Sequence, residues 1–70
     1  MLNVLEVVKK TSEFFASKGV ESSRLNAELL VSHCLGLGRM ELYLQFERPV
    51  SDRELASIRE LVRRRGRRDL

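Results

Sequence analysis

The stretch Arg24–Arg39, with the sequence RLNAELLVSHCLGLGR, decides how the chain is interpreted, because its apolar residues and glycines define a helix and the end of that helix. Ser22 or Ser23 can cap this helix, and Gly36 can stop it after Leu35. Its polar side chains form one narrow strip, made of Arg24, Glu28 and Ser32. Apolar residues fill most other positions, namely Leu25, Leu29, Leu30, Val31, Cys34 and Leu35. A helix this apolar is expected in the middle of a bundle.

Helices are also predicted on both sides of this stretch. Asn3 begins a capping box, and the helix after it is expected over residues 4–18, with Gly19 as its stop. Ser51 begins a second capping box, and Gly66 is expected to end the helix that follows. Both helices carry an apolar stripe, at Val4, Val7, Val8, Thr11, Phe14 and Phe15 in the first and at Leu55, Ile58, Leu61 and Val62 in the last.

The segment Met40–Glu47 fits two kinds of secondary structure. Apolar residues alternate with other residues as in a half-buried strand, at Met40, Leu42, Leu44 and Phe46. The same letters fit a short helix in which Met40, Tyr43 and Leu44 share one face. A lone strand would have no partner elsewhere in the chain, so we expect the short helix.

The size of the chain is that of one small domain. It has 70 residues, of which 43% are hydrophobic and 33% charged, with four glycines and one proline. This balance is typical of a folded chain rather than a disordered one. A domain this short has little room for an enclosed cofactor cavity. Short connections favour near-antiparallel neighbours, so we predict that residues 1–70 form a single all-α domain, a compact bundle of four to five short helices.

The composition also indicates in which cellular compartment the protein is expected. A single cysteine excludes an internal disulfide and every metal site that needs several cysteines. No apolar run is long enough to cross a membrane. The first residues lack the basic start of a signal peptide, because Lys9 and Lys10 follow the apolar residues instead of preceding them. We therefore expect a cytoplasmic protein that makes no membrane contact.

The residues that could carry chemistry have ordinary structural explanations. His33 and Cys34 are adjacent, so on a helix they point about 100° apart and cannot act as base and nucleophile. A metal site needs more ligands than one His and one Cys. Gly36-Leu-Gly38 follows a helix instead of a strand, which indicates a turn and not a dinucleotide loop. Each carboxylate is expected at a helix cap or on a solvated, charged helical face.

The net charge of +3 is concentrated at the C-terminal end. Residues 1–58 hold 7 Lys/Arg against 8 Asp/Glu, a net of −1, whereas residues 59–70 hold 6 Arg against 2 Asp/Glu, a net of +4. This run could be a solvated helix end, a linker into another domain or a phosphate-binding patch, and its spacing favours the first two. A helix-turn-helix DNA reader is not favoured, because Glu41 and Glu47 would repel phosphates.

As a whole, Arg24–Arg39 strongly resembles the signature of the N-terminal helical domain of the release-factor glutamine methyltransferases, the HemK or PrmC family. The family stretch reads approximately Arg-Leu-Asp-Ala-Glu-Leu-Leu-Leu-Ala-His-Val-Leu-Gly-Leu-Ser-Arg. The matching residues include Arg24, Ala27, Glu28, Leu29, Leu30, His33, Leu35, Gly36 and Arg39. The flanking features agree as well, so the resemblance covers nearly the entire chain. Asn26 replaces the usual Asp, and Asp69-Leu70 stands where Glu-Pro is usual.

The resemblance implies an all-helical domain that precedes a catalytic domain dependent on S-adenosylmethionine. Such a domain would recognise and position peptide chain release factors, in which the glutamine of a Gly-Gly-Gln motif is methylated. The family's Asn-Pro-Pro-Tyr motif and its Gly-rich cofactor loop have no counterpart in these 70 residues. We therefore expect the catalytic domain to be absent, the chain alone to be inactive, and its residues to include none that are catalytic, cofactor-binding or metal-binding.

The partners implied by the resemblance are a release factor and the catalytic domain of the parent chain. The spacing of the arginines does not favour nucleic acid as a partner. The residues expected to contact a partner are Arg24, Glu28, Arg39, Arg63 and Arg64. One alternative is a stand-alone basic helical module that binds RNA or the ribosome through its arginines. Another is a helical fragment without independent binding. The salt dependence of binding separates release-factor recognition from RNA binding, because phosphate contacts weaken by orders of magnitude as salt rises.

Overall fold

Four α-helices joined by short connections account for residues 2–66, the residues that our computed structural model describes. The helices are α1 (Val4–Ser17), α2 (Ser23–Leu35), α3 (Arg39–Leu44) and α4 (Asp52–Gly66). No β-strand forms within residues 2–66, so the all-α prediction is confirmed. The ambiguous segment is helical as far as Leu44, as we expected.

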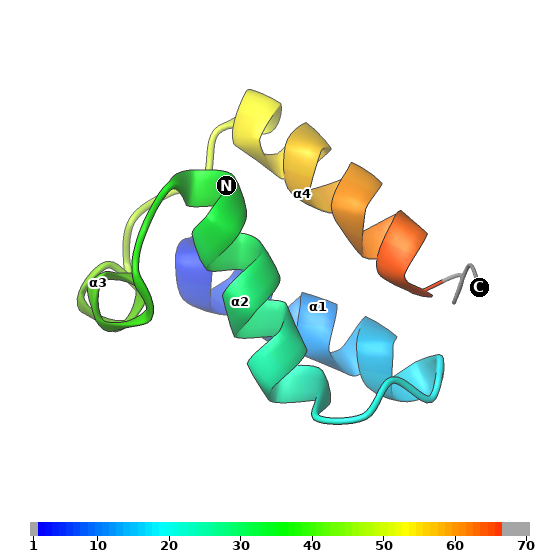
Figure 1. The fold of residues 1–70 in the computed structure, drawn as a ribbon. Coiled ribbons are helices and arrows are strands. Elements are labelled where there is room, and N and C mark those ends of the chain that lie inside the picture. The colour runs from blue at the N-terminus through cyan, green and yellow to red at the C-terminus, as the bar shows by residue number, and fades with distance from the viewer. Residues whose placement is uncertain (1, 67–70) are drawn as a thin grey trace.

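The three longer helices run in alternating directions (Figure 1). α2 runs back along α1, with which it makes the most extensive contact, and α4 runs opposite to α2. α3 lies at one end of the bundle and is seen nearly end-on, so it crosses the direction of the other helices. The longer helices therefore alternate in direction, as the short connections predict, while α3 crosses them.

The start of α1 is fixed by a capping box and by backbone contacts to a distant segment. The Asn3 side chain accepts a hydrogen bond of 2.9 Å from the Glu6 N–H, as the sequence predicts. The preceding N–H groups, of Val4 and Leu5, donate to the carbonyls of Arg48 and Phe46 at 2.9 and 3.0 Å. These N–H groups have no partner within the helix, so the segment before α4 satisfies them.

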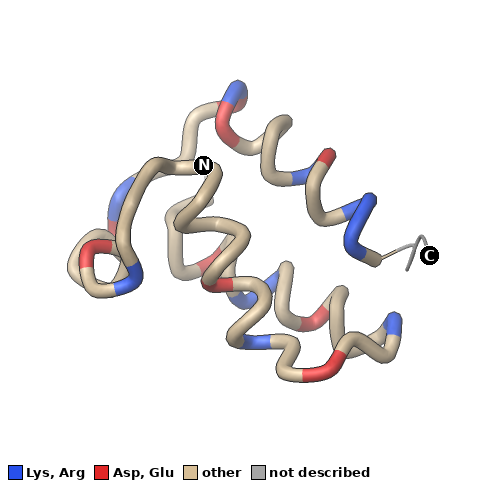
Figure 2. Tube along the Cα trace, viewed as in Figure 1, with Lys and Arg blue, Asp and Glu red and all other residues tan. Residues whose placement is uncertain are grey.

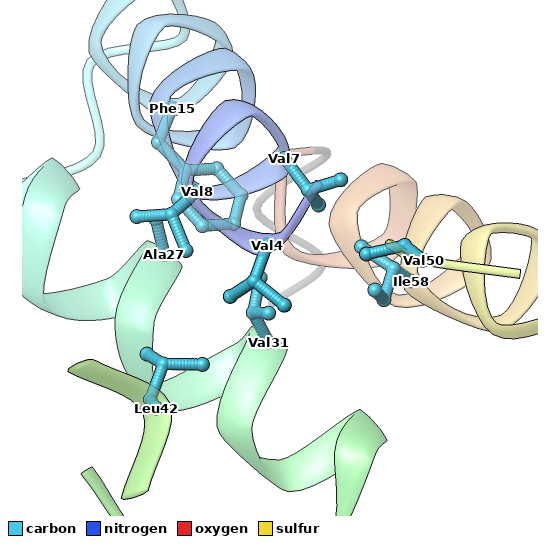
Figure 3. Packing of buried hydrophobic residues seen from close by; sticks show 9 residues of the cluster. All are labelled: Val4, Val7, Val8, Phe15, Ala27, Val31, Leu42, Val50 and Ile58. Atoms are coloured by element: carbon cyan, nitrogen blue, oxygen red, sulfur yellow. The ribbon is translucent and has the colours of Figure 1, made fainter. Parts of the chain in front are cut away.

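Nine buried apolar side chains form the core between the helices (Figure 3), namely Val4, Val7, Val8, Phe15, Ala27, Val31, Leu42, Val50 and Ile58. The stripe predicted for α1 is confirmed, except that Phe14 is only partly buried. In α4, Ile58 is fully buried, and Leu55 and Val62 pack against the core. Phe15 is the largest fully buried side chain, and truncating a buried phenylalanine costs about 3–5 kcal/mol.

The face that α2 buries differs from the sequence prediction. Leu25 and Leu29 are 41% and 48% exposed, although their apolar character predicted a place in the core. The buried face instead consists of Ala27, Glu28, Val31 and Ser32. Three of these four side chains are small, which lets α2 approach its neighbours closely. The predicted polar strip is therefore turned partly inward, because a helix that is apolar nearly all round has no single stripe to fix its rotation.

The residues predicted to share one face of α3 are exposed instead of packed in the core. Met40 and Leu44 are 77% and 84% exposed, and Leu42 is the one residue of α3 that is fully buried. A helix of six residues turns fewer than two full turns, so it presents only a narrow face to the core.

The start of α2 follows the predicted position but not the predicted cap. Ser22 occupies the N-cap position, yet its side chain accepts no hydrogen bond from the helix and its backbone is left-handed, with φ 50°. The Asn26 side chain holds this turn, since its Nδ2 donates to the carbonyls of Glu21 and Ser22 at 2.8 and 3.2 Å. At the other end, Gly36 is left-handed with φ 69°, as the predicted stop requires.

Gly66 is the last described residue of α4, and its role is one of close approach. A Cβ atom added at this position would lie 2.6 Å from Cε2 of Phe14 on α1. A side chain there would therefore force Phe14 to move. Lys18 also lies against this ring, with its Nζ 5.6 Å from the centre of the Phe14 ring.

Candidate functional site

A buried carboxylate connects α2 with α3. Glu28 is only 4% exposed, and its two oxygens accept hydrogen bonds from three side chains. Arg24, one turn earlier in α2, donates to Oε2 at 2.8 Å. Arg39 and Tyr43, one turn apart in α3, donate to Oε1 at 3.0 and 2.6 Å. We call these four residues the Glu28 cluster.

The Glu28 cluster holds its carboxylate in the charged form. Burial by itself raises the pKa of Glu28, but the hydrogen bonds from Arg24, Tyr43 and Arg39 outweigh that effect and lower the pKa. The pKa of Arg39 is raised by its contacts with Tyr43 and Glu28. The expectation that every carboxylate is solvated is therefore wrong for Glu28. Within residues 2–66, no buried side-chain nitrogen or oxygen lacks a hydrogen-bond partner.

Large exposed apolar side chains lie on the same two helices as the Glu28 cluster. Among residues 2–66, the large hydrophobic residues that are exposed all belong to α2 and α3, and we call them the α2–α3 apolar surface: Leu25, Leu29, Met40, Tyr43 and Leu44. Tyr43 belongs to both sets, since its hydroxyl bonds Glu28 and its ring packs edge-on against Phe46 at 5.3 Å. These side chains lie on two helices that contact each other, and exposed apolar side chains that form a patch are typical of a protein contact site.

The partner-binding residues expected from the sequence separate into two places. Arg24, Glu28 and Arg39 meet in the Glu28 cluster. Arg63 and Arg64 lie on α4, where they pair with Glu60 at 3.9 and 3.3 Å. Figure 2 shows that positive charge gathers at the C-terminal end of α4. The structure therefore joins three of the five residues and separates the other two from them.

The arginines of α4 are partly engaged inside the domain. Arg65 donates to Oδ1 of Asn26 at 2.9 Å, which ties the end of α4 to the start of α2. Asn26, which stands where the resembled signature has Asp, thus bonds Arg65 through its oxygen and the preceding turn through its nitrogen. An aspartate would keep the first contact and lose the second. The remaining arginines of the sequence run, at positions 67 and 68, lie outside the described residues.

Sequence reasoning missed Tyr43 and the exposed leucines as parts of a site. Tyr43 follows Arg39 by four residues, the spacing that places two side chains on one helical face, and this signal could have paired them. The exposure of Leu25 and Leu29 left no such signal, because it depends on how α2 is rotated in the bundle.

No set of side chains in the described part of the chain suggests a metal or a nucleophile. No group of three or more His, Cys, Asp or Glu residues there could hold a metal ion. His33 is exposed, and burial raises the pKa of the Cys34 thiol above its usual value. None of the described helices is both long enough and apolar enough to span a bilayer.

The structure is that of a small all-helical domain with exposed apolar side chains on α2 and α3. Residues 6–69 match the family of the PrmC N-terminal domain, and the chain belongs to this family. The resemblance noted in the sequence is thereby confirmed. No solved structure gives a significant match.

Curated relatives carry the name release factor glutamine methyltransferase. The relative from Chlorobaculum tepidum is 48% identical over 63 residues, and that from Rhodopirellula baltica is 44% identical over 63 residues. Each alignment covers 90% of this chain and 21% of the relative. A relative from Geobacter sulfurreducens is 44% identical over 66 residues, covering 94% of this chain and 23% of its own length. The chain thus spans less than a quarter of these relatives.

Proposed function

We propose that this chain is the release-factor-recognition domain of a release factor glutamine methyltransferase. In this proposal it positions a peptide chain release factor so that the glutamine of the Gly-Gly-Gln motif reaches the catalytic domain of the parent protein. Membership of the PrmC N-terminal family and the names of the relatives support the proposal. The observation that carries it is the α2–α3 apolar surface, which no described part of the chain covers.

The Glu28 cluster gives this surface a defined shape. α3 buries only Leu42, so apolar packing alone holds it weakly. The hydrogen bonds from Arg39 and Tyr43 to a buried carboxylate add strong, directional contacts between α3 and α2. Met40 and Leu44, one turn apart, are then presented on a fixed helix instead of a loose loop, which reduces the ordering cost of binding.

Binding at this surface would act on the substrate away from the reacting atoms. Energy from such a remote contact holds the release factor equally in the ground and transition states, which lowers KM. Where the contact also orients the glutamine, turnover rises as well. The chain itself carries no step of methyl transfer in this proposal.

S-adenosylmethionine would bind the catalytic domain and not this one. Residues 2–66 contain no strand followed by a Gly-rich loop, and the turn at Gly36 follows a helix, so they do not fit this cofactor. We also propose a cytoplasmic location, since the single, half-buried cysteine suits a reducing compartment.

The test is binding of purified release factor to the 70-residue chain by calorimetry. Met40→Ser combined with Leu44→Ser should weaken binding by about tenfold or more, because apolar anchors at the centre of an interface carry much of its energy. The matched control, Ala16→Ser with Ala56→Ser, changes exposed residues of α1 and α4 and should leave binding unchanged. Equal affinities for both double variants would refute this surface as the contact site.

The alternative of RNA binding through the arginines has less support. Arg63 and Arg64 share the carboxylate of Glu60, and Arg65 bonds Asn26, so part of the positive charge is engaged within the domain. Titration of the complex with salt separates the two functions. An apolar contact should change little between about 50 and 300 mM salt, whereas phosphate contacts would lose orders of magnitude in affinity.

A further inference from the structure

A groove lies between α1 and α4, away from the α2–α3 apolar surface. Its volume is about 330 Å³, and apart from Leu2 every lining residue belongs to one of these two helices. Val7 and Ile58 are fully buried at its floor, and Phe14, Leu55 and Val62 are partly buried around them. Apart from the buried Thr11, the floor is therefore apolar along both helices.

The rim of the groove is positively charged. Lys10 lines it from α1, and Arg59 and Arg63 line it from α4, while none of its lining residues is acidic. Within residues 2–66, Lys10 and Arg59 have no carboxylate at ion-pair distance, and Arg63 reaches Glu60 only at 3.9 Å. The charge of the rim is thus largely uncompensated, in contrast to the arginines around Glu28.

The spacing of the lining residues suits a helix. Val7 and Phe14 are seven residues apart on α1, as are Leu55 and Val62 on α4, which corresponds to a length of about 10 Å, or two helical turns. Two helices that line a groove at this spacing can accept the apolar face of a third. The close contact of Gly66 with Phe14 brings α4 against α1 and bounds the groove at that end.

We propose that this groove docks a short amphipathic helix of a partner protein, with apolar side chains on one face and Asp or Glu residues along both edges. The apolar face would cover the floor, and the acidic edges would pair with Lys10, Arg59 and Arg63. This inference goes beyond the proposed function, because it assigns a second contact site that does not share residues with the first.

The experiment measures binding of a labelled peptide to the 70-residue chain by fluorescence anisotropy. The probe is a synthetic peptide of about sixteen residues, long enough for partial helix formation, with Leu at positions i, i+3, i+4 and i+7 and Glu on the flanks. We expect saturable binding that weakens as salt rises. A second peptide, with every Glu replaced by Lys, should bind at least about tenfold more weakly.

Charge-reversal variants then locate the site. Lys10→Glu with Arg59→Glu should weaken binding of the Glu peptide by about tenfold or more and strengthen binding of the Lys peptide. The matched control, Lys9→Glu with Arg53→Glu, makes the same charge change on the same helices at positions that do not line the groove, and should have a much smaller effect. Circular dichroism checks that each variant remains folded.

Three outcomes would overturn the proposal. The first is no saturable binding of the Glu peptide, and the second is the same loss of binding in both double variants. The third is binding of laurate in the groove, lost with Lys10→Glu, when the peptide does not bind, since that result assigns the site to a fatty acid. Met40→Ser with Leu44→Ser should leave peptide binding unchanged, so failure here is distinguishable from failure of the proposed function.

Discussion

The Tyr43 hydroxyl donates a hydrogen bond of 2.6 Å to Oε1 of Glu28, and this contact joins α3 to the buried face of α2. The same oxygen accepts a hydrogen bond from Arg39, and Arg24 bonds the other oxygen. One carboxylate therefore stabilises both its own helix and the short helix beside it. Each donor keeps part of its side chain in water, which limits the cost of burying the charge.

Glu28→Gln should destabilise the domain by roughly 1–3 kcal/mol, because the amide keeps the shape of the carboxylate but loses its charge-assisted hydrogen bonds. The loss should be smaller than for a fully buried ion pair, since Arg24 and Arg39 are half-exposed and regain water. Urea unfolding measures the change. Glu13→Gln, an exposed change on α1, should stay within about 0.5 kcal/mol, and equal stabilities of the two variants would contradict a structural role for Glu28.

Stability should be constant in neutral solution and fall in acid. The pKa of Glu28 in the folded state lies below its ordinary value of 4.5, so the unfolded chain takes up a proton first as the pH drops. The stabilisation is complete above pH 4.5 and is lost as the pH falls through the folded pKa. The hydrogen bond that Glu54 accepts from the Ser51 N–H lowers the pKa of Glu54. This shift also makes the domain less stable in acid.

Urea midpoints at about pH 7, 5 and 3 test this dependence. We expect little change between the first two values and a clear drop at the third. Glu28→Gln should reduce the size of that drop, because it removes one of the groups responsible. A drop of the same size in the variant would show that Glu28 does not contribute to it.

The effect of Gly66→Ala on the stability of the domain should depend on the residue at position 14. Alanine favours a helix over glycine by up to about 1 kcal/mol, but the added Cβ lies 2.6 Å from Cε2 of Phe14 and forces the ring to move. With Phe14→Ala in the background, the substitution should stabilise the domain. A double-mutant cycle by thermal unfolding should give a coupling of about 1 kcal/mol. Simple additivity would mean that the two helices do not touch there.

Ser22→Gly should stabilise the domain by up to about 1 kcal/mol. Ser22 has a left-handed backbone, which costs a residue with a Cβ roughly 1–2 kcal/mol, and glycine avoids most of that cost while losing more chain entropy. The side chain makes no capping bond, so nothing is lost with it. The melting temperature measures the gain. Ser12→Gly, within α1, is the control and should lower it.

Leu29→Ala and Val31→Ala should lower the free energy of unfolding by very different amounts, although both residues are apolar and lie in α2. Leu29 is 48% exposed, so its truncation should cost well below 1 kcal/mol, whereas Val31 is fully buried and should cost about 1–3 kcal/mol. Denaturant unfolding of the two variants compares these values. A larger loss for Leu29→Ala would mean that α2 is rotated differently in solution.

Much of the secondary structure could be predicted because it depends on local contacts. The capping boxes at Asn3 and Ser51 bond residues three positions away, and both form as predicted. Gly36 stops α2 through its own backbone conformation. The amphipathic stripe of α1 is confirmed because its polar residues are numerous enough to leave one face for the core.

Residues close together in the chain were enough to predict the family. They were enough to predict only part of the candidate site. Arg24 and Glu28 lie one turn apart in α2, a spacing that places them on one polar strip and lets them pair, and Arg39 belongs to the resembled signature. That Arg39 and Tyr43 bond the same carboxylate depends on where α3 lies, which no spacing within α3 states. Arg63 and Arg64, which we expected to contact the same partner, lie on another helix.

The sequence by itself therefore determined the helices, their ends and the family, because each of these follows from residues close together in the chain. Only the tertiary structure decided which face of α2 is buried, since that helix is apolar on nearly every side and its rotation is set by how closely α1 and α4 can pack against it. That rotation buries Glu28, exposes Leu25 and Leu29, and so creates the surface to which we assign the function.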